Sequence, residues 1–457
     1  MQLQYLTSSS VVVEAGETTV LCDPWLLDGA FSGAWHHYPP LEFAPEEYGH
    51  VDYLYISRPH PGRLHPPTLE RLDDDIPVLV HADAPDRLGE TVKRLGFDLV
   101  ELPDADRTSL GDDLVVEVFA AGPDAEHSAE LDEHDRELAS SRPWHADGAV
   151  PTADAAPLAV FDDSESVLAN ASACRWPVAE GACAAVTERY GDIDGLITPY
   201  ATADSHPQCR IDYPYDRKLA ARDEAVRSMY AGAEAFVNAL KPHYFFPVAD
   251  QYALGGSLAR VDEYVALQTQ NEAFWHFAGS PFIEPADSLP VVINSEEHFD
   301  LETGEPSANF VPIDRDERRE YVRTELARRS LAYESDDRPT LEDLRTLLPD
   351  AYENLEAKRA EMDWESETTV LIDLVRDTAV AVSMSGDGYE LVDQSPGTAV
   401  EAPFLYLTMD SRLLRRVLSG SQRVRFSDAR LGSHVRFERE PDVREPPLDR
   451  ALDAYHA

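Results

Sequence analysis

A short apolar segment that runs directly into a polar, proline-rich loop constrains the fold of this chain more than any other feature. Residues 51–55, Val-Asp-Tyr-Leu-Tyr, have the pattern of a buried strand, and residues 56–65 follow as Ile-Ser-Arg-Pro-His-Pro-Gly-Arg-Leu-His. Other strand-like runs occur at residues 77–80, 99–102 and 114–119, and residues 86–95 have helical spacing. Strands that alternate with helices predict an α/β layered fold.

Several further segments occur in a recognisable order along the chain. They are Cys22-Asp-Pro-Trp-Leu, the strand and loop at residues 52–57, Asn170 to Pro177, Tyr200-Ala-Thr-Ala and Phe246-Pro-Val-Ala. Together they resemble the CMP-N-acetylneuraminate hydroxylase-like branch of the metallo-β-lactamase superfamily, relatives of the lactonase-type hydrolases, over about residues 5–260. The resemblance implies an αββα sandwich. Residues 404–436 are similar to the small sterol-carrier-like domain appended in this branch, which implies a C-terminal α+β domain.

The pattern predicts three parts of the chain. We expect a metallo-β-lactamase-like domain at residues 1–300, a charged helical segment at residues 301–365, and a small α+β domain at residues 366–457. Residues 121–156 are acidic and rich in alanine, which predicts a flexible insertion with exposed histidines.

The resemblance implies a metal-binding loop whose ligands are mostly replaced. The family loop reads Ser-His-x-His-x-Asp-His, and here Arg58, His60, Gly62 and Arg63 stand at the four ligand positions. Ala173 stands where the branch has a further Asp ligand. A guanidinium offers only N–H donors, so it does not bind a metal cation. No cofactor is therefore favoured, and the Cys-x-His and Cys-x-x-His pairs of the hydroxylases' Rieske domain are missing from this chain.

The same loop predicts binding of an anion. Residues 53–69 contain no acidic residue, although the chain as a whole is strongly acidic. Arginine binds phosphate and carboxylate through paired N–H donors. The candidate anion-binding residues are Arg58, His60, Arg63 and His65. In the alternative reading, the two arginines pair with acids such as Asp23 or Asp204 and only fill the vacated site.

Two functional hypotheses follow. The first is a protein with a degenerate metal site that binds an anionic small molecule of the nucleotide-sugar or phosphate type. The alternative is a metal-dependent hydrolase that uses a displaced metal site with one Zn, Mn or Fe ion. The candidate ligands of that ion are His60, His65, Asp204 and His206, because loops at strand ends converge on one edge of such a sandwich.

Composition limits the partners of the chain. It has 86 acidic and 39 basic residues, a formal net charge of −47 and only four lysines. This balance predicts a surface adapted to high salt, a halophilic type of protein, and argues against nucleic-acid binding. The N-terminus has no signal-peptide pattern and no apolar run approaches the length of a membrane span. We expect a cytoplasmic protein without membrane insertion, while a protein partner or a homo-oligomer stays open.

Overall fold

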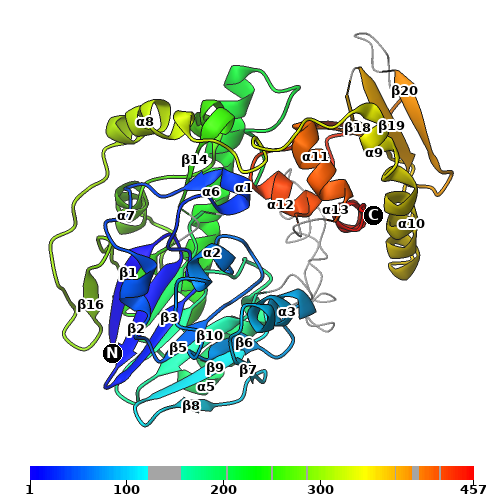
Figure 1. Cartoon of the computed structure of the whole chain (residues 1–457). Helices are drawn as coiled ribbons and strands as arrows, with labels where there is room; N and C mark the ends of the chain where they lie inside the picture. Colours follow the sequence, from blue (N-terminus) through cyan, green and yellow to red (C-terminus); the bar gives the residue numbers. More distant parts are fainter. Residues whose placement is uncertain are drawn as a thin grey trace.

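The computed structural model describes residues 1–121, 156–201, 204–248, 251–284, 287–375, 377–393, 401–420 and 424–457. The predicted insertion at residues 121–156 lies outside these ranges except for its two end residues. Figure 1 shows two sheets in the first part of the chain and a third sheet, with its own helices, toward the C-terminus. No helix in the described ranges has the length and apolar character that a membrane crossing requires.

The first sheet has eight strands in the order β17-β16-β1-β2-β3-β5-β6-β7. Strands β1 to β3 are antiparallel, whereas β3, β5, β6 and β7 are parallel. The strands are β1 Gln2–Thr7, β2 Ser10–Ala15, β3 Thr18–Cys22, β5 Tyr53–Tyr55, β6 Val78–His81, β7 Leu99–Leu102, β16 His298–Asp300 and β17 Glu305–Pro306. Helices α2 Pro66–Leu69 and α3 Asp86–Arg94 connect the parallel strands.

The second sheet has seven strands in the order β15-β13-β12-β11-β10-β9-β8. Its members are β8 Thr108–Leu110, β9 Leu114–Phe119, β10 Leu158–Asp162, β11 Val167–Asn170, β12 Gly195–Thr198, β13 Tyr244–Pro247 and β15 Leu289–Pro290. In the described residues, the helices of this half are α5 Glu180–Tyr190, α6 Tyr215–Leu240 and α7 Gln270–Ala278. A two-stranded ribbon joins β4 Trp35–His36 to β14 Ala253–Leu254, beside the helices α1 Ala30–Gly33 and η4 Gly256–Tyr264. The short helix η1 Pro45–Tyr48 lies with α2 and α3, because its Tyr48 shares their buried cluster.

Alternation along the strands divides the core into layers. Val20 of β3 faces the second sheet and shares a buried cluster with Phe161 of β10, whereas Leu21 faces the other way and packs with Leu88 of α3. On the far side of the second sheet, buried residues of α5, α6 and α7 share a cluster with Val160 and other residues of the sheet. The layers are therefore helix, sheet, sheet and helix, as the predicted α/β sandwich requires.

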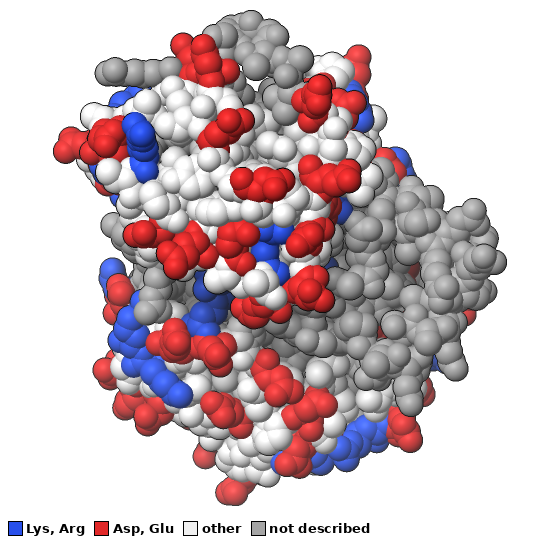
Figure 2. Space-filling view, turned by 90° about the vertical axis from the view of Figure 1, so that its right-hand side faces the viewer, with Lys and Arg blue, Asp and Glu red and all other residues white. Residues whose placement is uncertain are grey.

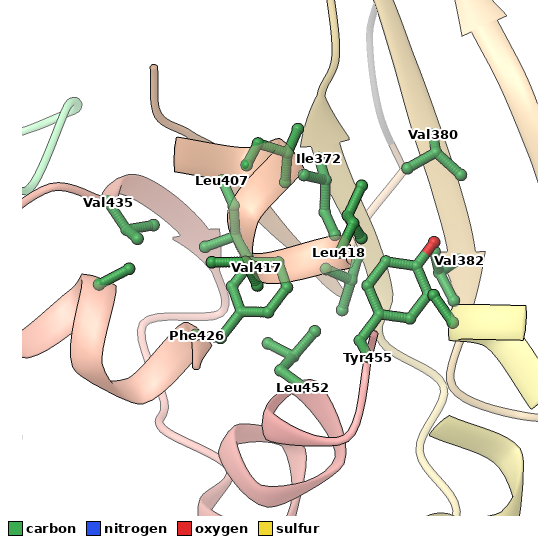
Figure 3. Packing of buried hydrophobic residues seen from close by; sticks show 14 of the residues in the cluster. Ile372, Val380, Val382, Leu407, Val417, Leu418, Phe426, Val435, Leu452 and Tyr455 are labelled. Atoms are coloured by element: carbon green, nitrogen blue, oxygen red, sulfur yellow. The ribbon is translucent and has the colours of Figure 1, made fainter. Parts of the chain in front are cut away.

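The C-terminal part is a five-stranded sheet, order β20-β19-β18-β21-β22, covered by helices. Helix α8 Arg315–Thr324 and η5 Leu326–Arg328 precede this unit and pack beside β14 and η4, where Val322 and Leu326 share a buried cluster with Ala253. The elements of the unit are α9 Leu341–Arg345, α10 Leu348–Glu361, β18 Thr369–Asp373, β19 Thr378–Ser383, β20 Tyr389–Asp393, β21 Phe404–Thr408, α11 Ser411–Leu418, α12 Phe426–Leu431, β22 Arg436–Glu440 and α13 Pro446–Asp453. Figure 3 shows the core of this unit, where Phe426, Leu452 and Tyr455 pack against strand residues such as Leu407. Leu348 and Leu355 of α10 belong to the same core.

Main-chain pairing joins the two parts of the molecule. The amide of Phe437 in β22 donates to the carbonyl of Cys209 at 3.0 Å, and the amide of Ile211 donates to the carbonyl of Phe437 at 2.9 Å. A second contact lies at α1 and α12 (Figure 1), where His434 Nε2 is 2.7 Å from the carbonyl oxygen of Phe31. Acidic side chains predominate over basic ones on the face shown in Figure 2.

Candidate functional site

Three strand ends meet where the resemblance places a metal centre. Strands β3 and β5 are parallel neighbours, so Asp23 and the loop that starts at residue 56 leave the first sheet at the same edge. Strand β11 of the second sheet ends at Asn170, and Ser172 follows it. These ends bring Asp23, Ser172 and the loop residue Arg63 together, although they are far apart in the sequence.

Arg63 forms a buried ion pair at this meeting point. Its side chain is 0% exposed, as is that of Asp23. The guanidinium donates to the Asp23 carboxylate, to Ser172 Oγ at 3.1 Å and to the Ser172 carbonyl at 2.8 Å. The arginine thus bridges the two sheets and carries one positive charge into the site.

Ser57 completes the environment of Asp23. Its amide donates to Asp23 Oδ1 at 2.8 Å, and its hydroxyl lies 2.9 Å from Oδ1 and 2.8 Å from Oδ2. The carboxylate therefore accepts bonds from a backbone amide, a hydroxyl and a guanidinium, which a buried charge requires. Ser57 serves here as a donor to Asp23.

Arg58 belongs to the same charged environment. Burial raises the pKa of the Cys174 thiol to about 12, against the opposing effect of the charges on Arg58 and Arg63. Arg58 is half-buried, whereas Arg63 is fully buried. Ala173, which stands where the branch has an Asp ligand, lies between Ser172 and Cys174 and offers no donor atom.

His60 lies within a buried aromatic cluster. Its ring centroid is 5.0 Å from that of Phe31 and 5.8 Å from that of Trp35. Trp35 stacks on Tyr252, with centroids 3.7 Å apart and planes 3° from parallel. The Gly62 amide donates to His60 Nδ1 at 3.3 Å. This cluster fills space beside the ion pair and surrounds the histidine with apolar rings.

His65 is held neutral by its surroundings. Its Nδ1 lies 2.9 Å from Thr68 Oγ1, which also accepts a bond from the Leu26 amide at 3.0 Å. Burial, together with nearby His37, lowers the pKa of His65 to about 3. At neutral pH this imidazole carries no charge with which to attract an anion.

The low pKa of His65 predicts acid sensitivity. In the unfolded chain the pKa of a histidine is about 6.5. Below that pH, the unfolded chain therefore binds a proton that the folded chain does not. The stability that neutral His65 contributes is complete above pH about 6.5 and falls by about 2 kcal/mol on acidification to about pH 5. We expect His65→Gln to lose less stability than the wild type between these pH values in denaturant titrations. Equal losses in the two proteins would contradict the assignment.

Asp204 and His206 lie in a different environment, beside the C-terminal unit. The His206 amide donates to Asp204 Oδ1 at 3.0 Å, and both residues line a pocket with Arg430, Arg439 and Arg444. Burial alone would raise the pKa of Asp204, but the charges of Arg430 and Arg444 outweigh it and lower the pKa to about 2. No local motif marks these arginines. The only sequence feature that could have pointed to them is that arginine is frequent in the last fifth of an otherwise acidic chain.

A metal ion does not fit the side chains at the strand ends. Throughout the described ranges, no group of three or more His, Cys, Asp or Glu side chains has a geometry that could hold a metal ion. The Arg63 guanidinium already contacts Asp23, and its fixed charge would repel a second cation there. The four candidate ligands His60, His65, Asp204 and His206 thus do not form a metal site in the described part of the chain.

Comparison with known proteins gives partial matches. No family model matches the chain. The cytidine monophosphate-N-acetylneuraminic acid hydroxylase of Asterias rubens is 34% identical over 85 residues, which are 18% of this chain and 13% of that protein. The Mus musculus hydroxylase is 35% identical over 85 residues, 18% of this chain and 15% of that protein. The chain therefore matches only a small part of the length of these relatives.

Solved structures with a similar arrangement are hydrolases and a hydroxylase. The isothiocyanate hydrolase from Delia radicum gut bacteria gives a TM-score of 0.42 at 14% identity, over 66% of this chain and 99% of that one. A possible metal-dependent hydrolase from Veillonella parvula gives 0.42 at 12% identity, over 65% and 98%. The diiron β-hydroxylase CmlA from Streptomyces venezuelae gives 0.33 at 19% identity, over 54% and 44%. The resemblance to the CMP-N-acetylneuraminate hydroxylases that the motifs predicted is confirmed by these hydroxylase matches, over one segment of the chain.

Proposed function

We propose that this protein is a metal-independent relative of the metallo-hydrolases that binds an anionic small molecule, with Arg63 in place of the metal. The observation that carries the proposal is the buried contact of Arg63 with Asp23 and Ser172. A guanidinium keeps its charge at every physiological pH. It can therefore neutralise Asp23 permanently, as a bound cation would, but it offers no open coordination position for a water molecule.

The loop that follows β5 supports the anion-binding part of the proposal. Arg58 is half-buried and lies in the same charged environment as Arg63, and residues 53–69 contribute no acidic side chain. Arg63 forms an ion pair with Asp23, and the low pKa of His65 keeps that side chain neutral. We therefore assign the anion to the half-buried Arg58 of the same loop. A phosphate-type ligand, such as a nucleotide sugar, suits a guanidinium.

Three finer assignments stay predictions. They are the sterol-carrier-like character of the C-terminal unit, the adaptation of the acidic surface to high salt, and the cytoplasmic location. The boundaries of the predicted domains at residues 300 and 365 likewise stay predictions.

Metal content tests the proposed function. Protein purified in high salt without chelator should contain far less than one zinc, manganese or iron ion per chain by elemental mass spectrometry. A matched control is the triple variant Arg58→His, Arg63→His and Ala173→Asp, which removes the internal cation and returns three donors to the ligand positions. We expect this variant, if its circular dichroism is native, to retain more zinc than the wild type. A near-stoichiometric metal in the wild type that is lost in His60→Ala would instead establish the hydrolase hypothesis.

A further inference from the structure

A pocket lies at the junction between the first part of the chain and the C-terminal unit. It encloses about 820 Å³, counting space that is open to solvent. The loop at residues 204–206 forms one wall, and β21, α12, β22 and the residues around α13 form the others. Neither Arg63 nor the histidines of the loop after β5 line it. The pocket is therefore separate from the Asp23–Arg63 site.

Part of the pocket wall is apolar. Figure 3 shows Leu407, Phe426 and Leu452 directed toward one another, with Val435 beside them. These side chains come from β21, α12, α13 and the residue before β22, so four segments contribute to one apolar surface. Such a surface suits the hydrocarbon part of a ligand.

The other part of the wall carries arginines that share their partners. Arg430 and Arg444 both bind the Asp449 carboxylate, at 3.0 Å and 2.7 Å. Asp442 is shared by Arg439 at 3.3 Å, Arg217 at 3.4 Å and Arg210. Asp449 thus serves two guanidiniums and Asp442 serves three, of which Arg210 also pairs with Asp212.

Two of these guanidiniums have donors left over. Within the described residues, Arg430 donates only from Nη1 and Arg439 only from Nε. The remaining N–H groups of each form part of a planar fork that matches a carboxylate or phosphate. Burial lowers the pKa of Arg439. Asp442 raises it by a smaller amount and the charge of Arg210 lowers it again, so this pKa lies below its ordinary value. An anion beside Arg439 would offset this desolvation of its charge.

We propose that this pocket binds an anionic amphiphile, whose carboxylate or phosphate head group pairs with Arg430 and Arg439 and whose apolar part lies against Leu407, Phe426 and Leu452. The inference rests on the proposed function in one respect, that the protein is a binding protein for an anion. It adds a second ligand site, apart from the loop after β5, and the chemical class of the ligand that this site takes. The ligand would contact both parts of the chain, because Asp204 and His206 form the wall opposite the C-terminal unit.

Isothermal titration calorimetry with decanoate, decyl phosphate, decanol and inorganic phosphate tests this inference. We expect decanoate or decyl phosphate to bind, and decanol to bind at least tenfold more weakly, roughly the effect of losing one charge-assisted hydrogen bond. Inorganic phosphate, which lacks the whole apolar chain, should bind more weakly still. Comparison of decanoate with octanoate should show about a fourfold gain in affinity for each methylene buried. Comparison of decanoate with decyl phosphate identifies the preferred head group.

Substitutions locate the binding site. Arg430→Gln and Arg439→Gln should each weaken binding by about tenfold to a hundredfold, the loss expected for a hydrogen bond to a charged group. Arg436→Gln is the matched control, because Arg436 is exposed on the same strand β22, at a position that does not line the pocket. Unchanged affinity in both pocket variants would overturn the inference.

The outcomes separate this inference from the proposed function. If Arg58→Gln removes anion binding and the pocket variants do not, the ligand binds at the loop after β5, and only the pocket inference fails. If none of the amphiphiles binds the wild type at all, the pocket inference fails, whatever the metal content. If the wild type contains stoichiometric metal, the proposed function fails even where the pocket binds decanoate.

Discussion

Arg63→Met is expected to lower the free energy of unfolding by about 3–5 kcal/mol, the usual result of removing one partner from a buried ion pair. The substitution leaves the Asp23 carboxylate in a fully buried position with Ser57 as its remaining donor among the described residues. It also removes two bonds to Ser172, and with them a link between the two sheets. The charge on Asp23, rather than lost packing, should account for most of the effect, because Met fills a similar volume.

Denaturant titrations measured by tryptophan fluorescence would determine this free energy, since Trp25 and Trp35 are buried in the neighbouring cluster. The control is Arg58→Met, a substitution of the same kind at a half-buried position of the same loop. A double variant, Asp23→Leu with Arg63→Met, removes both charges and should recover part of the loss. If Arg63→Met costs less than about 1 kcal/mol, the value typical of exposed pairs, Arg63 does not replace a buried cation.

The sequence predicted the strand and the loop at the site but left the use of the loop's arginines open. An apolar run of strand length, followed by a polar loop, is visible in residues 51–65, and β5 and the loop are where the pattern indicated. The loop was equally compatible with two roles for its arginines. They could bind an anion, or they could pair with acids such as Asp23 or Asp204. The structure places Arg63 on Asp23, and the second partner, Ser172, was not anticipated. A contact between residues more than a hundred positions apart leaves no trace in the local pattern.

The expected convergence of His60 and His65 with Asp204 and His206 depended on a general property of strand-end loops. The segment at residues 209–211 instead pairs with the edge strand β22, which holds Asp204 and His206 against the C-terminal unit. The residues of this loop do not by themselves predict its pairing with β22. Sequence position alone therefore could not divide the four candidates between two places in the molecule.

The predicted charged helical segment at residues 301–365 contains an apolar pattern that its many charged residues obscure. Leu344, Leu348, Ala351 and Leu355 recur at spacings of three and four residues, the pattern of one apolar helix face. They are buried in the core of the C-terminal unit, while the charged residues between them face outward. The prediction of a charged helical segment rested on the charged residues and did not use this apolar spacing.

Arg210→Met is expected to weaken the junction between the two parts of the chain by about 2–4 kcal/mol, the sum of lost hydrogen bonds to two partly buried carboxylates. Arg210 is 1% exposed and donates to Asp212 at 2.6 Å and to Asp442. Its guanidinium also lies over the rings of Tyr213, at 4.2 Å, and Phe437, at 5.4 Å. Tyr213 and Asp212 follow the segment at residues 209–211, whereas Phe437 and Asp442 belong to the C-terminal unit, so one side chain connects both.

Arg217→Met is the matched control for this prediction. Arg217 contacts the same Asp442, at 3.4 Å, and the same Tyr213 ring, at 3.8 Å, but its side chain is 54% exposed. Water replaces most of what an exposed arginine contributes, so we expect a loss below about 1 kcal/mol. Denaturant titration measures both effects, and limited proteolysis should cleave Arg210→Met faster than the control. Because Phe437, Arg439 and Asp442 line the junction pocket, the same variant should also bind decanoate more weakly. Equal stability and equal affinity in the two variants would show that Arg210 holds neither the junction nor the pocket together.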